Sequence, residues 1–381
     1  MQKLMSATAI LAATTTLASA GGLDRSGQSI GILFEEGNYA ELSFGFTSPS
    51  VNGSDLNTGA NTGNVADNFV TAGFGLKYQF NDKVSFALIV DEPYGSDIDY
   101  PVTPTSVSLG GTGATVDSYA VTGVVRYKFD DNFSVHGGLR YQEISADVSL
   151  GGLVYGPLNG YNASFASTGD VGYLIGAAYE RPDIALRVAL TYNSGTTHDL
   201  DTVESLPAAL AAAFGPTVSS STTVETPESI NLDFQTGIAK DTLLFGSVRY
   251  ARYTDTIVSP VIFDQVVNET VSGDSLTSIE DSLDLALGVG YRFNAAWSGS
   301  VALGYSRPDV NSLVSPLAPI DGTQSITVGA RYTHKNMVIS GGIRYTRFGD
   351  ALPETGTPDE ARASFTDNDA VSAGLRIGYR F

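Results

Sequence analysis

The sequence predicts an all-β protein, a 14-stranded antiparallel transmembrane β-barrel with a short N-terminal plug (hatch) in its lumen. Segments of alternating apolar and polar residues recur along the chain, and the connections between them are alternately short and long. No segment approaches the roughly 20 consecutive apolar residues that a membrane helix needs. A chain that spans lipid without helices must be a closed barrel, because only closure satisfies every backbone polar group.

Residues 1–20 have the features of a signal peptide. Lys3 precedes a run of Ala, Leu, Ile and Thr, and the segment ends in Ala18-Ser19-Ala20, a small-x-small cleavage site. We therefore expect a secreted chain that begins at Gly21 after processing.

Residues 21–38, with the sequence GGLDRSGQSIGILFEEGN, show no alternation and are too polar and glycine-rich for a strand. At the periplasmic end of a barrel, such a segment either folds inward as a plug or remains a disordered tail. In the first interpretation the plug includes Asp24, Arg25, Ile32 and Phe34.

Residues 39–381 are predicted to form the barrel. The last segment, NDAVSAGLRIGYRF, alternates strictly, with apolar or aromatic residues from Val371 to Phe381 at odd positions. The final pair on this face, Tyr379 and Phe381, resembles the C-terminal assembly signal of outer-membrane barrels. The expected partners therefore include outer-membrane lipids and the barrel assembly machinery, and the expected location is the bacterial outer membrane.

Short and long connections alternate along the barrel segment, as in outer-membrane barrels with periplasmic turns and outer loops. The short turns lie at 81–82, 130–131, 181–182, 240–241, 294–295 and 334–336. The long connections are 51–67, 97–116, 150–168, 199–223, 256–280, 310–323 and 350–367. Seven hairpins place both termini in the periplasm.

Parity assigns each residue to the lipid or the lumen. In strand 281–293, for example, Leu285, Leu287 and Val289 face lipid and Asp284 faces the lumen. Aromatic residues recur at both ends of the strands, as in the two girdles of a membrane barrel; a soluble β-sandwich would not need them. The periplasmic girdle comprises Tyr78, Phe80, Tyr127, Phe129, Phe133, Tyr291, Phe293, Trp297, Tyr379 and Phe381, and the outer girdle Tyr141, Tyr192, Tyr250, Tyr305 and Tyr345.

The composition excludes several classes of protein. A net charge of −20 argues against nucleic acid binding, and the absence of cysteine excludes disulfides and thiolate metal sites. We expect no cofactor and no metal. Acidic residues gather in the predicted loops at 199–204 and 354–360, where they either solvate exposed loops or bridge to an anionic outer leaflet through divalent ions.

Eight arginines fall on the predicted lumen face, and the sequence leaves two interpretations open. They either attract and bind a carboxylate, with Arg140 and Arg292 as candidate contacts, or form a salt-bridge ladder with inward acids such as Glu143 and Asp284. The eight are Arg126, Arg140, Arg187, Arg249, Arg292, Arg331, Arg344 and Arg376.

The third strand contains Pro93-Tyr94-Gly95 after the run KVSFALIV. Proline removes a ladder donor, and every strand of a barrel is central. The break therefore indicates either a kink with a local opening of the wall or a strand end at the outer rim.

Two outer loops carry apolar residues that could form a groove. Leu206, Leu210 and Phe214 lie on a predicted helix over 206–215, with proline in its first turn and glycine at its end. The facing wall is expected from loop 150–168, through Leu153, Val154 and Leu158.

An enzyme is not predicted. The three histidines are His136, His198 and His334, and only His136 has a nearby candidate nucleophile, Ser134, on the same strand face. A pair of this kind near the periplasmic end is more often structural.

The order and spacing of several stretches resemble the FadL/TodX family of outer-membrane transporters of long-chain fatty acids and related hydrophobic compounds. These stretches are residues 22–38, FTSPSVNG, FGLKYQFNDKVSFALIVDEPYG, VRYKFDDNFSVHGGLRY, ALTYNSGTTHDL and GVGYRFNAAWSGSVALGYS, and the similarity spans the mature chain. One departure is that Gly37-Asn38 leads directly into the first strand, without the Asn-Pro-Ala motif in which the family's hatch usually ends.

The resemblance implies passive uptake of a fatty acid or similar hydrophobic molecule by a monomer. The ligand would bind in the outer-loop groove, then beside the hatch, and leave sideways through a gate at Pro93, Tyr94 and Gly95. The alternatives are a general diffusion porin and a structural or adhesive barrel. The sequence does not distinguish fatty acids from aromatic hydrocarbons as the permeant.

Overall fold

The computed structural model describes residues 23–381 except 104–105, 268–274, 278, 310–311 and 357–359. The predicted signal peptide lies outside the described residues. No helix in the described part of the chain is both long and apolar enough to cross a membrane.

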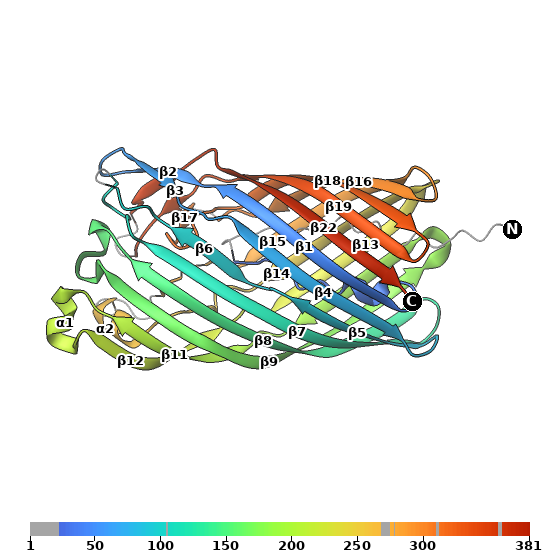
Figure 1. Cartoon of the computed structure of the whole chain (residues 1–381), viewed down its shortest axis with the longest axis horizontal. Helices are drawn as coiled ribbons and strands as arrows, with labels where there is room; N and C mark the ends of the chain where they lie inside the picture. The colour runs from blue at the N-terminus through green and yellow to red at the C-terminus, as the bar shows by residue number, and fades with distance from the viewer. Residues whose placement is uncertain (1–22, 104–105, 268–274, 278, 310–311, 357–359) are drawn as a thin grey trace.

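The fold is a closed antiparallel barrel, as predicted (Figure 1). Its sheet contains 17 strands, and three crossings of the wall are each divided into two of them, β5 with β6, β10 with β11 and β12 with β13, which leaves 14 crossings. The ring closes where β1 (Tyr39–Ser50) pairs with β22 (Asp369–Arg380) along its whole length. Closure pairs the first strand of the barrel with the last, so neither is left as a free edge.

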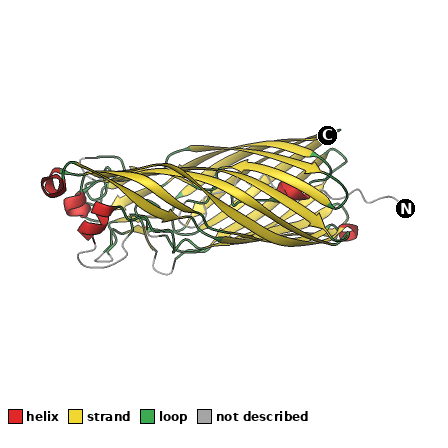
Figure 2. Cartoon of the chain, turned by 90° about the horizontal axis from the view of Figure 1, so that it is seen from below, coloured by secondary structure: helices red, strands yellow, loops and turns green. Residues whose placement is uncertain are grey.

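The other wall strands are β4 (Phe69–Gln79), β5 (Val84–Asp91), β6 (Gly95–Asp99), β7 (Gly113–Lys128), β8 (Phe133–Leu150), β9 (Tyr161–Arg181), β10 (Leu186–Asn193), β11 (Thr197–Ser205), β12 (Thr217–Glu225), β13 (Ser229–Ala239), β14 (Thr242–Ala251), β15 (Ser282–Arg292), β16 (Trp297–Ser306), β18 (Thr323–His334) and β19 (Met337–Phe348). Short connections and the C-terminus lie at one end of the barrel, which we call the turn end, and long connections lie at the other, the loop end (Figures 1 and 2).

The loop end contains more structure than the sequence predicted. Residues 199–204, expected in a loop, lie in β11, which forms a hairpin with β12; more buried and exposed residues alternate along both strands. The predicted helix is α1 (Ala208–Phe214) at the tip of this hairpin. A second helix, α2 (Val261–Val267), was not predicted.

Smaller elements complete the loop end. These are η2 (Leu153–Leu158), β2 (Asn52–Asp55), β3 (Asn61–Asn64), β17 (Leu313–Val314), β20 (Leu352–Pro353) and β21 (Ala363–Phe365). At the turn end, η3 (Pro182–Ile184) precedes β10, so Ile184 belongs to the turn rather than to the strand.

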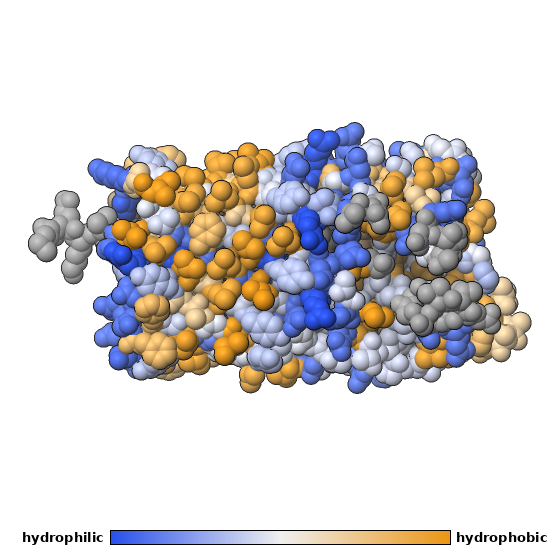
Figure 3. All heavy atoms as spheres, turned by 180° about the vertical axis from the view of Figure 1, so that it is seen from behind, coloured by the Kyte–Doolittle hydropathy of each residue, from blue (hydrophilic) through white to orange (hydrophobic). Residues whose placement is uncertain are grey.

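The predicted faces of the wall are confirmed. Leu287 and Val289 are 52% and 43% exposed on the outside, whereas Ser282 of the same strand is fully buried. Figure 3 shows the apolar side chains gathered in a band over the turn-end half of the barrel, followed by a hydrophilic band. The prediction for Glu143 was wrong: it shares the outward parity of Tyr141, and its carboxylate accepts hydrogen bonds from the Tyr141 and Ser167 hydroxyls.

Buried apolar side chains form separate clusters along the lumen. Two clusters fill the loop end: the first is centred on Tyr161, Phe165 and Phe263, and the second on Tyr100 and Phe365. A third cluster surrounds the N-terminal segment near the turn end. The loop end is therefore packed rather than open.

Candidate functional site

The N-terminal segment 23–36, which we call the plug, lies inside the lumen. Ile30, Ile32 and Leu33 are buried there, the last two within the short helix η1 (Gly31–Phe34). A tight turn places the first residues, because Gly27 (φ 59°) and Gln28 (φ 53°) adopt left-handed conformations and the Gly27 N–H donates to the Asp24 carboxylate. The residues predicted for the hatch, Asp24, Arg25, Ile32 and Phe34, lie within this segment.

Charged contacts attach the start of the plug to the wall. Asp24 and Arg249 form an ion pair at 2.6 Å with both side chains almost fully buried. Arg249 also donates to Ser229 and Asn231, each at 2.8 Å. Arg25 pairs with Asp97 of β6 and lies over the Phe69 ring, 4.3 Å from its centroid.

The other end of the plug is held by stacking and by one further ion pair. Two guanidinium groups lie over the Phe34 ring, those of Arg126 and Arg187, at 4.6 Å and 4.5 Å from its centroid. Cations over an aromatic face are attracted by its negative potential. Arg380 of β22 bonds the Glu35 carboxylate at 3.0 Å. The plug is thus fastened to several separate strands.

The wall is interrupted beside the plug. β5 pairs with β7 as far as Asp91 opposite Ala120, and β6 resumes with Gly95 opposite Asp117, so residues 92–94 face only 118–119. This is a bulge within a continuing crossing rather than a strand end. Pro93 has no N–H to donate to a neighbouring strand, and a Cβ at Gly95 would overlap the Arg25 guanidinium, so glycine leaves room for the plug at this point.

The bulge separates two strands of the wall. The β4–β5 ladder stops at Phe74 opposite Val90, whereas the β4–β1 ladder continues to Phe69. Residues 69–73 therefore lack a ladder partner on the β5 side, where the Ala72 N–H donates instead to the Glu92 carboxylate at 3.1 Å. We call this opening the wall gap.

The backbone of the bulge turns toward the plug and pairs with it. The Arg25 N–H donates to the Pro93 carbonyl at 2.8 Å, and the Gly95 N–H donates to the Leu23 carbonyl at 2.9 Å. Asp24 and Tyr94 form an isolated antiparallel bridge. The plug therefore replaces the strand neighbour that the bulge gives up.

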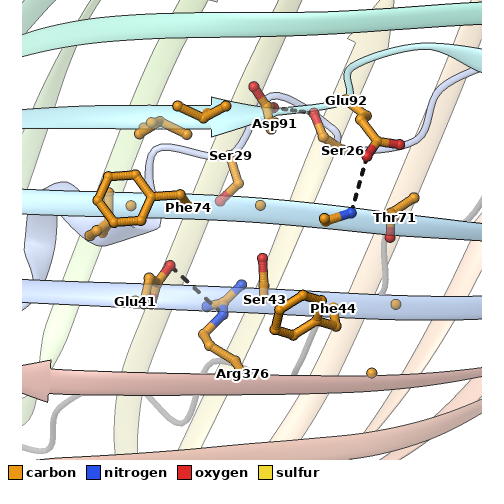
Figure 4. Close-up of a pocket in the computed structure, with 18 of the residues that line it drawn as sticks. Ser26, Ser29, Glu41, Ser43, Phe44, Thr71, Phe74, Asp91, Glu92 and Arg376 are labelled. Atoms are coloured by element: carbon orange, nitrogen blue, oxygen red, sulfur yellow. Dashed lines mark hydrogen bonds and ion pairs between the residues drawn. The ribbon is translucent and has the colours of Figure 1, made fainter.

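A cavity of about 130 Å³, the gap cavity, lies between the plug and the wall gap. Figure 4 shows Thr71 and Ser43 among its lining residues, with the Ser26–Asp91 hydrogen bond and the Arg376–Glu41 ion pair drawn beside it. A larger lumen cavity, about 240 Å³, lies against β13–β16 and β18. The β14–β15, β15–β16 and β16–β18 ladders beside the lumen cavity are continuous. Of these two cavities, it is therefore the gap cavity that adjoins a break in the wall.

The predicted groove residues do not form one open groove. Leu158 and Leu206 are buried in the first loop-end cluster, and Leu210 packs against it. Val154 packs against the second cluster. Leu153 and Phe214 are exposed, at 69% and 40%. Loop segment η2 and helix α1 contact each other.

The two predicted ligand-contacting arginines lie elsewhere. Arg140 is buried and donates to the Thr122 hydroxyl at 3.0 Å, and it lines neither the gap cavity nor the lumen cavity. Arg292 is exposed at the turn end, where it pairs with Asp241, because β15 ends there. Among the predicted lumen arginines, Arg126 pairs with Glu180, Arg249 with Asp24, Arg292 with Asp241 and Arg376 with Glu41.

The candidate nucleophile and base are engaged separately. Ser134 accepts a hydrogen bond from Arg126, while His136 Nε2 is 2.9 Å from the Thr191 hydroxyl. His198 lies in a network with Thr196 and the Thr168 carbonyl. Within the part of the chain that the structure describes, the hydrogen-bond partners of these two histidines are threonine hydroxyls and a backbone carbonyl.

Sequence reasoning missed Glu204, which is fully buried at the loop end. Its carboxylate accepts the Tyr161 hydroxyl at 2.8 Å and the backbone N–H groups of Ile262 and Phe263 in α2, the latter at 3.1 Å. Burial beside this carboxylate raises the pKa of Tyr161. Alternation along β11 offered one signal, because it places Glu204 on the same face as Leu200 and the acids Asp199 and Asp201 on the opposite face.

A closed barrel with an inserted N-terminal segment and a break in its wall is the architecture of a plugged transmembrane channel. The family comparison is more specific. The chain belongs to the outer membrane transport protein family OMPP1/FadL/TodX, whose model matches residues 33–381. No curated protein matches the sequence.

Solved structures show the same fold at low sequence identity. A FadL homologue of Pseudomonas aeruginosa superposes with a TM-score of 0.74 at 15% identity, covering 92% of each chain. The toluene transporter TbuX of Ralstonia pickettii gives 0.61 at 15% identity, covering 92% of this chain and 90% of its own. The toluene transporter TodX of Pseudomonas putida gives 0.62 at 13% identity, covering 91% of each chain.

Proposed function

We propose that the protein is a passive outer-membrane channel for hydrophobic small molecules, which leave the lumen sideways through the wall gap. The observation that carries this proposal is the gap cavity, which lies between the plug and unpaired residues 69–73 of β4. The family and the toluene transporters among the similar structures support a hydrophobic permeant.

Lateral exit suits the energetics of such a permeant. Burial of an acyl chain is worth about 0.8 kcal/mol per methylene, and release into the aqueous periplasm would forfeit it. A path from the gap cavity into the bilayer retains that burial, so no energy source is required at this step. The proposal extends to a long-chain fatty acid as permeant, with aromatic hydrocarbons as the second candidate.

The proposed orientation places the turn end and both termini in the periplasm, and the loop end outside. In this orientation the apolar band seen in Figure 3 lies in the membrane. Initial capture is assigned to exposed Leu153 and Phe214 on the contacting η2 and α1 segments, with the protein acting as a monomer. The proposal also assigns Tyr379 and Phe381, at the end of the last strand, as the signal that the barrel assembly machinery recognises.

Filling the gap cavity tests the route. Thr71 points inward at the gap and lines the cavity, so Thr71→Trp should obstruct it while Thr71→Val preserves its size. In a transporter-null host, uptake of a labelled fatty acid and of labelled toluene should be measured separately. We expect Thr71→Trp to reduce uptake of the transported probe strongly and Thr71→Val to leave it near wild type.

The outcomes separate the alternatives. Normal uptake by a correctly assembled Thr71→Trp variant would overturn the lateral route and favour passage along the lumen. Uptake of hydrophilic solutes by the wild type would indicate a general porin. Absence of uptake of either probe would leave a structural or adhesive barrel.

A further inference from the structure

The connection between β16 and β18 folds into the barrel rather than outward. Residues 314–323, which we call the inward loop, are all buried. Val314, Leu317 and Ile320 are 7%, 5% and 8% exposed, although a connection at the loop end of a barrel is expected to face water. This segment is as deeply buried as the wall's own inward residues.

The inward loop occupies the space between the two loop-end clusters. Leu317 belongs to the cluster of Tyr161 and Phe263, while Val314 and Ile320 belong to that of Tyr100 and Phe365. The loop therefore joins packing from opposite parts of the ring across the loop end.

The apex of the inward loop also reaches the plug. Residues 318–320 line a cavity of about 50 Å³ together with Arg25 of the plug and residues 95–98 of the bulged crossing. A space of this size has room for a few water molecules but not for an acyl chain or an aromatic ring. A molecule from the loop end cannot reach the plug along this line without displacing the apex.

The hydrogen bonds of the inward loop are concentrated at its two ends. The Leu352 N–H donates to the Ser312 carbonyl at 2.7 Å, and the Gly349 N–H donates to the Gly322 carbonyl at 3.0 Å. Ser312 and Gly322 both have positive φ, 53° and 66°. Between these ends, the N–H groups of the described residues 316–320 donate only within the loop. The Leu317 and Ala318 N–H groups donate to Ser315, and the Ile320 N–H donates to the Ala318 carbonyl.

We infer that residues 315–320 form a second barrier in series with the plug, and that a permeant enters by displacing this apex. The recorded N–H bonds of residues 316–320 stay within the loop, so displacing the apex disrupts apolar packing but breaks none of the anchoring hydrogen bonds at Ser312 and Gly322. An apolar permeant covers the side chains that the displaced apex exposes, whereas a hydrophilic solute leaves them in water. The inward loop thus selects hydrophobic over hydrophilic molecules, an inference that rests on the proposed function.

Ion conductance tests the barrier without any permeant. The variants are deletion of residues 24–36, replacement of 315–320 by Gly-Ser-Gly, and the two combined, each measured as single channels in planar bilayers. Resistances in series add, so each single change should raise conductance only modestly, and the combination by at least about tenfold more, toward that of an open polar lumen. If the plug deletion alone reaches the conductance of the combined variant, the inward loop is not a barrier.

A reversible crosslink tests movement of the apex. The chain contains no cysteine, so Ala318→Cys with Ala370→Cys introduces two thiols that line the same small cavity. Joining them with a short cleavable crosslinker should abolish uptake of the transported probe, and cleavage should restore it. The control pair, Asp199→Cys with Thr223→Cys, joins register partners on the exposed face of the β11–β12 hairpin and should not change uptake.

Full uptake by the completely crosslinked 318–370 variant would overturn the proposed movement. Failure of the wild type to take up any hydrophobic probe would instead overturn the proposed function, while the conductance series would still decide whether the inward loop is a barrier.

Discussion

The ion pair between Asp24 and Arg249 should control release of the plug. Asp24→Asn removes the charge but keeps an oxygen that accepts the Gly27 N–H. Arg249 then remains buried without its carboxylate, retaining only neutral partners such as Ser229 and Asn231. The variant therefore isolates the electrostatic part of the attachment.

The expected magnitude follows from burial. Both side chains are less than a tenth exposed and 2.6 Å apart. Removing one partner of such a pair costs about 3–5 kcal/mol, and the neutral hydrogen bonds left to Arg249 favour the lower limit. At 1.4 kcal/mol per factor of ten, the population with a released plug should rise about a hundredfold.

Thiol labelling measures that population. Ile30 is 3% exposed, and Ile30→Cys would be the only thiol in the chain. Its labelling rate with a small polar maleimide should rise about a hundredfold in Asp24→Asn. Adding Arg249→Met should reverse most of this increase in labelling rate, because the uncompensated charge of Arg249 is then removed.

Asp367→Asn provides the matched control, since its pair with Arg347 is largely exposed and such pairs contribute about 0–1 kcal/mol. Equal labelling rates in the wild type and in Asp24→Asn would refute the reasoning. So would a double variant more open than Asp24→Asn alone.

Two further predictions concern the loop end. Glu204→Ala should accelerate hydrogen exchange of the Ile262 and Phe263 amides at least about tenfold, because each buried N–H left without an acceptor costs about 1–3 kcal/mol. Glu204→Gln, which keeps an acceptor oxygen, should accelerate exchange less. Unchanged exchange in both variants would contradict the assigned contacts. Burial, together with the charges of Asp321 and Glu280 and opposed by Arg307, raises the pKa of Asp309 to about 6 from its usual 3.8. The Asp309 N–H donates to the Asp321 carboxylate of the inward loop at 2.6 Å, so Asp309 binds its proton more tightly while this loop is packed; the resulting stabilisation is present below about pH 4 and is lost as the pH rises through 6. Labelling of Leu317→Cys, normalised to a free thiol, should increase over this range, and Asp309→Asn should remove the dependence.

The sequence alone determined the barrel wall. Lipid on one side and a polar lumen on the other impose a two-residue period, which Leu285 and Leu287 display against Ser282 and Asp284. The break at Pro93 could also be predicted from the sequence, because the missing N–H donor is a property of proline itself. These features depend on neighbours in sequence or on the solvent, not on a particular distant residue.

The tertiary structure decided what fills the lumen. Parity placed Arg249 inside, yet only the fold shows that its partner is Asp24, 225 residues away, while Arg292 ends at an exposed turn. It likewise placed the inward loop within the barrel and Glu204 at the start of α2. An alternating pattern states that a side chain points inward, but the residues it meets there depend on closure of the ring and on which segments enter it. The local sequence pattern therefore determines the wall, whereas the positions of the plug and the inward loop depend on long-range packing.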